Sequence, residues 1–249
     1  MNIVVCIKRT PDTETKIRLG DDGKSIDPGG VKYIISPYDE FAIEAALQVT
    51  EEGDGGEVTL VSLGGDDTPG TLRQGLAMGA HKAVHLKGDA DLDGLATARA
   101  LQAELETMDV PLVLFGMKSA DVDQQQVGPM VATLMDRPCA TGVSEFEVGD
   151  GVVTCQREVE GGTEVLELDL PAVVTMTKGK VEPRYASLKG IMAAKRKPME
   201  EKEAQTGEPR LTVRKLAYPP ERPEGRVVGE GPEAVPELVR LLREEAKAL

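Results

Sequence analysis

Short apolar runs alternate with helix-like patterns between residues 3 and 135, and this alternation restricts the fold more than any other feature of the chain. The first run is rich in β-branched side chains, as expected for a strand that is buried on both faces. Strands and helices that alternate in this way form a parallel sheet with helices on both faces. The sequence therefore predicts an α/β domain with a doubly wound, mostly parallel sheet. The expected strands are 3–7, 57–63, 83–86 and 111–115, and the expected helices start at residue 37 or cover 68–78, 92–107 and 123–135.

The first helix carries a recognisable start signal. Ser36 is a residue type that can cap a helix, and Pro37 suits the first helical position. Asp39 follows Ser36 by three positions, so its carboxylate could accept a hydrogen bond from the backbone N–H of Ser36, as in a capping box. In a doubly wound sheet, ligands bind beyond the carboxyl ends of the strands, near the point where the strand order reverses. The loops at 8–12, 63–67 and 116–126 follow strands and are therefore of functional interest.

The pattern changes after residue 142. Three alternating runs at 143–148, 152–158 and 163–168 are separated by glycine-containing turns, which indicates hairpins. Together with the apolar run at 172–176, they predict an antiparallel extension over residues 143–176. The sequence predicts that the α/β domain covers residues 1–198. An extended, charged and proline-rich tail is expected over 199–249, with a helix at 232–248 that either packs on a partner subunit or docks on its own domain.

Charge and cysteine content exclude several functions. The net charge of −14 argues against nucleic acid as a main partner, because phosphate groups would be repelled. Cys6, Cys139 and Cys155 are widely separated, and with only His81 and His85 beside them no zinc-binding spacing is present. No apolar stretch approaches the roughly 20 residues that span a bilayer, so we expect no membrane insertion. The short apolar N-terminal run differs from a signal peptide, and a cytoplasmic location is expected.

A polar segment at residues 116–130 follows an apolar strand and leads into a helix. Backbone N–H groups at such a junction can bind an anion, and Gly116 would allow close approach. Ser119 and the glutamines at 124–126 could add hydrogen bonds, while Asp121 and Asp123 could cap the helix or bind ribose hydroxyls. No glycine-rich phosphate motif is present. The residues alone leave two interpretations open, a nucleotide site and an ordinary polar turn.

Residues 180–197 form the second candidate site. Pro183 biases the residue before it away from helix, and the large apolar side chains of Tyr185 and Leu188 follow among polar residues. Such side chains must fold back on the domain or meet another protein. The segment is therefore either a loop that ends a strand or a docking loop for a partner protein. Basic residues at 195–197 would steer acidic partners.

Residues 182–192 read Glu-Pro-Arg-Tyr-Ala-Ser-Leu-Lys-Gly-Ile-Met, and this segment resembles the recognition loop of electron-transfer flavoprotein β-subunits. Three further segments are similar to that family: Val-Cys-Ile-Lys-Arg at 5–9 followed by Asp12, Ala-Met-Gly-Ala at 77–80, and the polar segment at 116–130. The resemblance covers residues 2–200 in matching order, and the tail matches only in character. It implies an adenine-nucleotide-binding, Rossmann-like fold and a carrier subunit without catalytic residues of its own.

The resemblance also implies cofactors and partners. The chain would form a heterodimer with a flavoprotein α-subunit that holds most of the redox-active FAD, and it would bury a structural AMP itself. Electrons would come from acyl-CoA dehydrogenases and related enzymes, and would pass to the respiratory chain through a quinone oxidoreductase. Matched position by position, the implied AMP site consists of Cys6, Ser36, Pro37, Tyr38, Asp39, Leu63, Gly116, Met117, Lys118, Ser119, Ala120, Asp121, Val122, Asp123, Gln124, Gln125, Gln126 and Val127.

Leu188 stands where the family has the leucine that anchors into acyl-CoA dehydrogenase-type partners. The implied partner-docking residues are Arg184, Tyr185, Leu188, Ile191 and Met192. Glu158 matches a carboxylate that contacts the mobile FAD domain of the α-subunit. The chain departs from the pattern at Thr13, where many relatives carry an aromatic side chain near the flavin, and at Ser36, where some carry Asn. Two alternatives remain: an electron-bifurcating subunit with a second FAD in place of AMP, and a stand-alone nucleotide-binding α/β protein.

Overall fold

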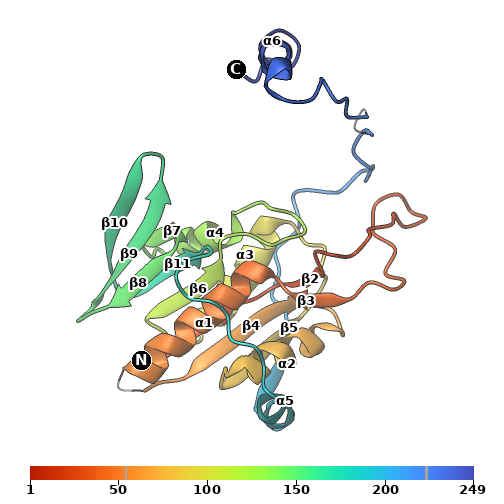
Figure 1. Ribbon diagram of the computed structural model, residues 1–249. Helices are drawn as coiled ribbons and strands as arrows, with labels where there is room; N and C mark the ends of the chain where they lie inside the picture. Colours follow the sequence, from red (N-terminus) through yellow and green to blue (C-terminus); the bar gives the residue numbers. More distant parts are fainter. Residues whose placement is uncertain (54, 222–223) are drawn as a thin grey trace. The chain divides into compact units, whose positions relative to one another are not determined.

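The computed structural model describes residues 1–53, 55–221 and 224–249, and it divides the chain into two units, Met1–Arg214 and Lys215–Leu249. The first unit is built on a seven-stranded sheet with the order β12-β5-β4-β1-β6-β11-β7, in which every pairing is parallel (Figure 1). This confirms the doubly wound, mostly parallel α/β fold that the sequence predicts. The strands are β1 Ile3–Cys6, β4 Val58–Gly64, β5 Lys82–Lys87, β6 Leu112–Gly116, β7 Cys139–Val143, β11 Ala172–Met176 and β12 Met199–Glu203.

Helices cover both faces of this sheet (Figure 1). Alternate residues of β1 point into two separate cores, with Ile3 and Val5 in one and Val4 and Cys6 in the other. Helices α1 and α2 pack on the first core, while α3 and α4 pack on the second. A strand that is apolar on both sides is what a sheet between two helical layers requires. The helices are α1 Pro37–Glu52, α2 Thr68–Met78, α3 Gly94–Leu105, α4 Val127–Leu134 and α5 Leu188–Ala194.

The predicted antiparallel extension is present but shorter than expected. It is a three-stranded sheet of β8 Glu145–Val148, β9 Val152–Val159 and β10 Gly162–Asp169. The run Ala172–Met176 does not belong to it, because β11 lies between β6 and β7 in the parallel sheet. All five β11 residues are buried, which explains why the run is apolar except for Thr175 instead of alternating. A further antiparallel pair joins β2 Arg9–Pro11 to β3 Tyr33–Ile35.

Two strands of the parallel sheet were not predicted. Strand β7 is interrupted by Gly142, whose φ of 67° lies in the left-handed region and breaks the strand pattern. Strand β12 is a mostly charged edge strand that pairs in parallel with β5. An edge strand that faces water needs few apolar residues, so the sequence assigned this segment to the tail. The two compact units divide after Arg214, whereas the end of the first domain was predicted at residue 198.

The second unit contains the predicted C-terminal helix. A short 3₁₀ turn, η1 Pro232–Ala234, leads into α6 Val235–Glu244, so the helix ends earlier than the expected residue 248. Arg240 pairs with Glu237 and Glu244 on its exposed surface. Arg222 and Pro223, in the proline-rich part of the tail, lie outside the described residues. Across the described ranges, no helix is both long and apolar enough to cross a membrane.

Candidate functional site

The carboxyl ends of β1 and β6 lie at the point where the order of the parallel strands reverses. From β1 the chain builds outward through β4 and β5, and it then returns to add β6 on the opposite side of β1. In such sheets this reversal opens a crevice beyond the strand ends. Cys6 ends β1 and Gly116 ends β6, so the predicted nucleotide residues on these strands meet at the reversal point.

Asp39 joins three elements at this crevice. Its carboxylate is buried and accepts hydrogen bonds from the backbone N–H of Lys8 at 2.7 Å and of Gly116 at 3.0 Å. The first turn of α1 is thereby fixed to the ends of β1 and β6. The predicted capping box is wrong, because Asp39 serves these distant donors and the Ser36 hydroxyl donates to the carbonyl of Lys118 at 3.4 Å. Pro37 does occupy the start of the helix, as predicted.

Gly116 is required by the close approach of this α1 turn. A Cβ atom added at Gly116 would lie 2.3 Å from Asp39 Oδ1 and 2.7 Å from the backbone nitrogen of Asp39. Contacts this short to a backbone atom do not occur between real side chains, so any other residue would displace α1 or β6. The glycine therefore permits the hydrogen bond that fixes Asp39.

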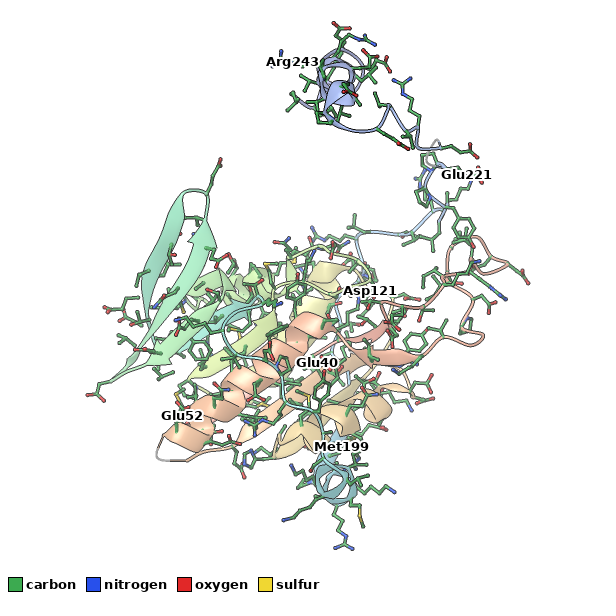
Figure 2. The ribbon with its side chains drawn as sticks, viewed as in Figure 1. Glu40, Glu52, Asp121, Met199, Glu221 and Arg243 are labelled. Atoms are coloured by element: carbon green, nitrogen blue, oxygen red, sulfur yellow. The ribbon has the colours of Figure 1, made fainter. Side chains whose placement is uncertain are left out.

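The segment 117–126 is a loop, and two lysines hold it in place. The Lys8 ammonium lies 2.9 Å and 2.8 Å from the two carboxylate oxygens of Asp121. The Lys118 ammonium lies 2.9 Å from Asp123 Oδ2 and 5.8 Å from the ring centre of Tyr38. Figure 2 shows Asp121 at this edge of the first unit.

Helix α4 begins at Val127, and the predicted start at Asp123 is wrong. Asp123 and Gln125 have φ angles of 55° and 52°, and these left-handed conformations interrupt a helix. Neither Asp121 nor Asp123 caps α4. This loop contains the Lys118 ammonium, the Ser119 hydroxyl and several side-chain amides, and the Lys8 ammonium lies beside it. Together they include the donors that phosphate and an adenine edge require. A phosphate group would compete with the two aspartates for the lysines.

The remaining predicted nucleotide residues line the same edge or support it. Cys6 is buried, and burial together with the nearby Asp39 charge raises the pKa of its thiol above the usual range. Leu63 is half-buried and packs on the core that α3 and α4 cover. The N–H of Met117 donates to the carbonyl of Met176 at 2.7 Å. Gln126 donates to Gln124 at 2.6 Å, whereas Ala120 and Val122 are exposed.

The free energy of unfolding is expected to decrease between about pH 4 and pH 7 because of Asp39. Burial raises the pKa of Asp39 from 3.8 to about 7, although its two N–H donors and Lys8 act in the opposite direction. Within this interval the folded chain binds one more proton than the unfolded chain. The stability that protonated Asp39 contributes is therefore complete below pH 3.8 and is lost as the pH rises through about 7. The slope reaches about −1.4 kcal/mol per pH unit.

Urea unfolding of the wild type and of Asp39→Asn over this pH range measures the effect. Asp39→Asn should remove the decrease, since an amide does not titrate. The matched control is Asp123→Asn, which changes an exposed carboxylate of the neighbouring loop 117–126 and should keep the wild-type slope. Equal slopes in the wild type and Asp39→Asn would contradict this assignment.

The predicted docking segment contains a helix where the sequence indicated a loop. Helix α5 begins at Leu188, and the Ser187 hydroxyl caps it by accepting the N–H of Gly190 at 3.0 Å. The helix has only seven residues and carries Gly190 within it, so its pattern is weak. The capping residue Ser187 was the feature of the sequence that could have indicated this helix. The apolar side chains are nonetheless exposed, with Tyr185 at 99%, Leu188 at 83%, Met192 at 71% and Ile191 at 46%.

Arg184 differs from these neighbours because its guanidinium group is engaged within the chain. It donates to Glu44 through Nε at 2.6 Å and through Nη2 at 2.8 Å. It also donates to Glu51 through Nη1 at 2.7 Å and Nη2 at 2.9 Å. Both glutamates belong to α1, so Arg184 attaches the docking segment to that helix. Sequence pattern does not indicate the pairing with Glu44 or Glu51, which lie more than 130 positions away.

Helices α2 and α5 cap each other. The Lys197 ammonium donates to the carbonyls of Leu76 at 2.9 Å, Gly79 at 3.0 Å and Ala80 at 2.6 Å, at the C-terminal end of α2. From α2, Arg73 donates to the carbonyls of Ala194 and Lys197 at the end of α5. Lys197 is therefore not available for steering, whereas Lys195 and Arg196 are exposed. These contacts hold α5 rigidly on α2.

Glu158, the predicted α-subunit contact, is exposed on β9 of the antiparallel sheet. It lines a pocket of about 450 Å³ together with Glu145, Lys178 and Lys180. This places it away from the crevice between β1 and β6, on a separate element of the first unit. Its predicted contact is compatible with that exposed position.

Comparisons with known proteins agree on one family. The family described as "Electron transfer flavoprotein domain" matches residues 25–206. The chain is 40% identical over 260 residues to the electron transfer flavoprotein subunit beta of Bacillus subtilis, with 100% of both chains covered. It is 36% identical to the mitochondrial subunit beta of Arabidopsis thaliana, with 99% of both chains covered. It is 37% identical to the subunit beta of Sus scrofa, covering 98% of this chain and 97% of that protein.

Proposed function

Because this chain belongs to the family of electron transfer flavoprotein β-subunits, we propose that it pairs with a flavoprotein α-subunit and carries no catalytic residue of its own. The observation that carries this proposal is the full-length similarity, which includes both candidate sites and the C-terminal tail. In the proposed heterodimer most of the FAD belongs to the α-subunit, and the FAD supplies the redox chemistry. This chain contributes a scaffold, a nucleotide site and a docking surface.

We propose that the crevice between β1 and β6 holds AMP as a structural group. The support is the donor set, which combines the Lys8 and Lys118 ammonium groups with the polar loop 117–126. Asp39 and Gly116 would fix the backbone around the nucleotide. Mass spectrometry of the nucleotide released from the purified protein distinguishes AMP from a second FAD, which the bifurcating alternative requires.

The docking surface is defined by Tyr185, Leu188, Ile191 and Met192, and we propose that it binds acyl-CoA dehydrogenases and a quinone oxidoreductase. Its apolar side chains are exposed although the backbone beneath them is fixed by Arg184, Arg73 and Lys197. Exposed apolar residues on a rigid support are typical of interaction sites. A small interface of this kind orients the partner and still allows it to dissociate, which suits repeated electron transfer.

Leu188→Ala is expected to slow electron transfer from an acyl-CoA dehydrogenase by about 30-fold, which corresponds to the loss of one interface hot spot of about 2 kcal/mol. The measurement is reduction of the heterodimer's flavin by the reduced dehydrogenase. Val165→Ala is the matched control, because Val165 is a 64% exposed apolar residue on β10, outside the docking surface. An unchanged rate in Leu188→Ala would disprove the anchoring role.

A cytoplasmic location also remains a proposal. It is supported by Cys6, Cys139 and Cys155, which are all free. The plant relatives are named as mitochondrial, so the family occurs in more than one compartment.

A further inference from the structure

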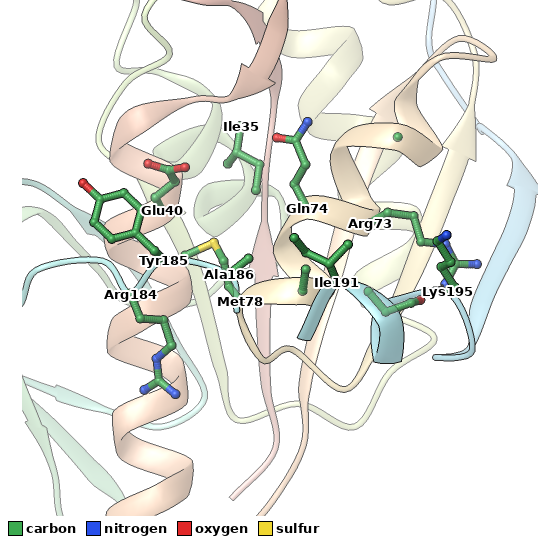
Figure 3. Close-up of a pocket in the computed structure, with 13 residues that line it drawn as sticks. Ile35, Glu40, Arg73, Gln74, Met78, Arg184, Tyr185, Ala186, Ile191 and Lys195 are labelled. Atoms are coloured by element: carbon green, nitrogen blue, oxygen red, sulfur yellow. Dashed lines mark hydrogen bonds between the residues drawn. The ribbon is translucent and has the colours of Figure 1, made fainter. Parts of the chain in front are cut away.

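A pocket of about 570 Å³ lies between α1, α2 and the docking segment (Figure 3). Its walls are mostly apolar and are formed by Ile35, Ala77, Met78, Ala186, Ile191 and Ala194. Tyr185 and Ile191 belong both to this pocket and to the docking surface. The pocket therefore opens within the surface on which a partner would dock, and it is large enough for a long side chain.

Glu40 places a carboxylate in this apolar environment. It is half-buried, and burial raises its pKa above the usual value. Within the described ranges of the chain, no group forms a hydrogen bond or ion pair with this carboxylate. Its neighbour along α1, Glu44, has such a partner in Arg184. A half-buried carboxylate without a partner is unfavourable, and it would bind a cation that enters the pocket.

The other polar groups of the pocket define where a cation would fit. Tyr185 and Gln74 line the pocket with Glu40, and they offer a ring face and an amide oxygen (Figure 3). Lys195 and Arg73 are also lining residues, and Figure 3 shows them on the side away from Glu40. Arg73 is already engaged by the carbonyls of α5. Arg184 also lines the pocket, on the Glu40 side in Figure 3, but its guanidinium group is already bound by Glu44 and Glu51. The Glu40 carboxylate is therefore the acidic group that a positive group would meet, and a long aliphatic stem would lie on the apolar walls.

We propose that this pocket receives an arginine or lysine side chain of the dehydrogenase that docks on Tyr185 and Leu188. This inference rests on the proposed docking function and adds a second anchor to it. Leu188 would enter the partner, while the partner's cationic side chain would enter this chain beside Glu40. Two anchors that point in opposite directions fix the orientation of the partner, which one leucine alone cannot do. The strongly acidic chain also favours a cationic group over an anionic one.

The pocket can be tested in the complete heterodimer with methyl-labelled methionine. The signal of Met78, which lines the pocket, is identified by its loss in Met78→Leu. N-acetyl-L-argininamide should shift this signal in a saturable manner, and N-acetyl-L-norleucinamide, which has a similar stem without the charge, should bind more weakly. Glu40→Gln should weaken binding of the arginine probe about tenfold, a loss of about 1.4 kcal/mol. The matched control is Glu52→Gln, at the other end of α1 (Figure 2), and it should bind as the wild type does.

Equal binding of the two probes, or an unchanged affinity in Glu40→Gln, would overturn the cation preference. The partner itself is tested by kinetics: Glu40→Gln should raise the dehydrogenase concentration at half-maximal rate about tenfold and leave the maximal rate nearly unchanged. An unchanged half-maximal concentration would overturn the assignment to the partner. Leu188→Ala separates the two proposals, because it should retain probe binding. If Leu188→Ala kept full electron transfer while the probe bound as expected, the docking function would fail and the cation site would remain.

Discussion

Arg184→Gln is expected to lower the free energy of unfolding by about 2–3 kcal/mol and to slow electron transfer from the proposed partner dehydrogenases, although the guanidinium group of Arg184 is bound by Glu44 and Glu51. The change leaves the Glu44 carboxylate, whose side chain is only 4% exposed, without its cation. Burial raises the pKa of Glu44, and at present the hydrogen bonds from Arg184 outweigh this effect and hold the pKa below its usual value. We place the expected loss below that of a fully buried pair, because the Arg184 side chain is 34% exposed.

Urea unfolding and flavin reduction by a reduced dehydrogenase measure the two effects. Arg240→Gln is a close control, because Arg240 also pairs with two glutamates but lies on the exposed face of α6. Its loss should cost less than about 1 kcal/mol. Adding Glu44→Gln to Arg184→Gln removes the unpaired charge, so part of the stability should return while electron transfer stays slow. Equal losses in Arg184→Gln and Arg240→Gln would contradict the role of Arg184 in holding the docking segment.

Gly116→Ala is expected to abolish the proposed AMP binding and to lower the free energy of unfolding by about 2 kcal/mol. The added Cβ would meet Asp39 Oδ1 at 2.3 Å and the Asp39 backbone nitrogen at 2.7 Å. Because both atoms belong to the first turn of α1, that turn must move and the hydrogen bonds of Asp39 must lengthen. The crevice would then lose the geometry that the proposed nucleotide site requires.

The amount of nucleotide released per heterodimer and the urea midpoint are the readouts. Gly65→Ala provides the matched control, since a Cβ at Gly65, in the turn after β4, meets nothing within 4 Å. It should keep the wild-type nucleotide content and stability. A Gly116→Ala protein with full nucleotide content would show that the Asp39 contact does not support the site.

The sequence predicted those parts of the fold in which burial dictates residue type. The inner strands β1, β4 and β6 are buried, so their apolar runs were visible, and the hairpins of the extension were marked by alternation and glycines. Strand β12 was not predicted, because an edge strand that faces water can consist mostly of charged residues. For the same reason residues 199–203 were predicted to belong to the tail.

Contacts between distant residues explain the other differences. Local pattern gave Ser36 and Asp39 capping roles, but their actual partners are Lys118, Lys8 and Gly116, which lie far along the chain. Arg184 was assigned to the docking surface from its neighbours, since the 140 positions that separate it from Glu44 conceal their pairing. Residue types located the site, whereas tertiary packing decided which of its side chains face outward.

The mutual capping of α2 and α5 makes these two helices one cooperative unit. If α5 left its place, three carbonyls at the end of α2 would lose the Lys197 ammonium, and Arg73 would lose its acceptors. The free energy needed to unfold α5 locally therefore includes part of the free energy needed to open α2, because the two helices share these contacts. The inner face of α2 belongs to the main core. A seven-residue helix in isolation would fray within nanoseconds to microseconds. In this chain α5 is stabilised against such fraying by its contacts with α2. The exposed leucine is consequently presented on a helix that opens less readily than a free helix of the same length.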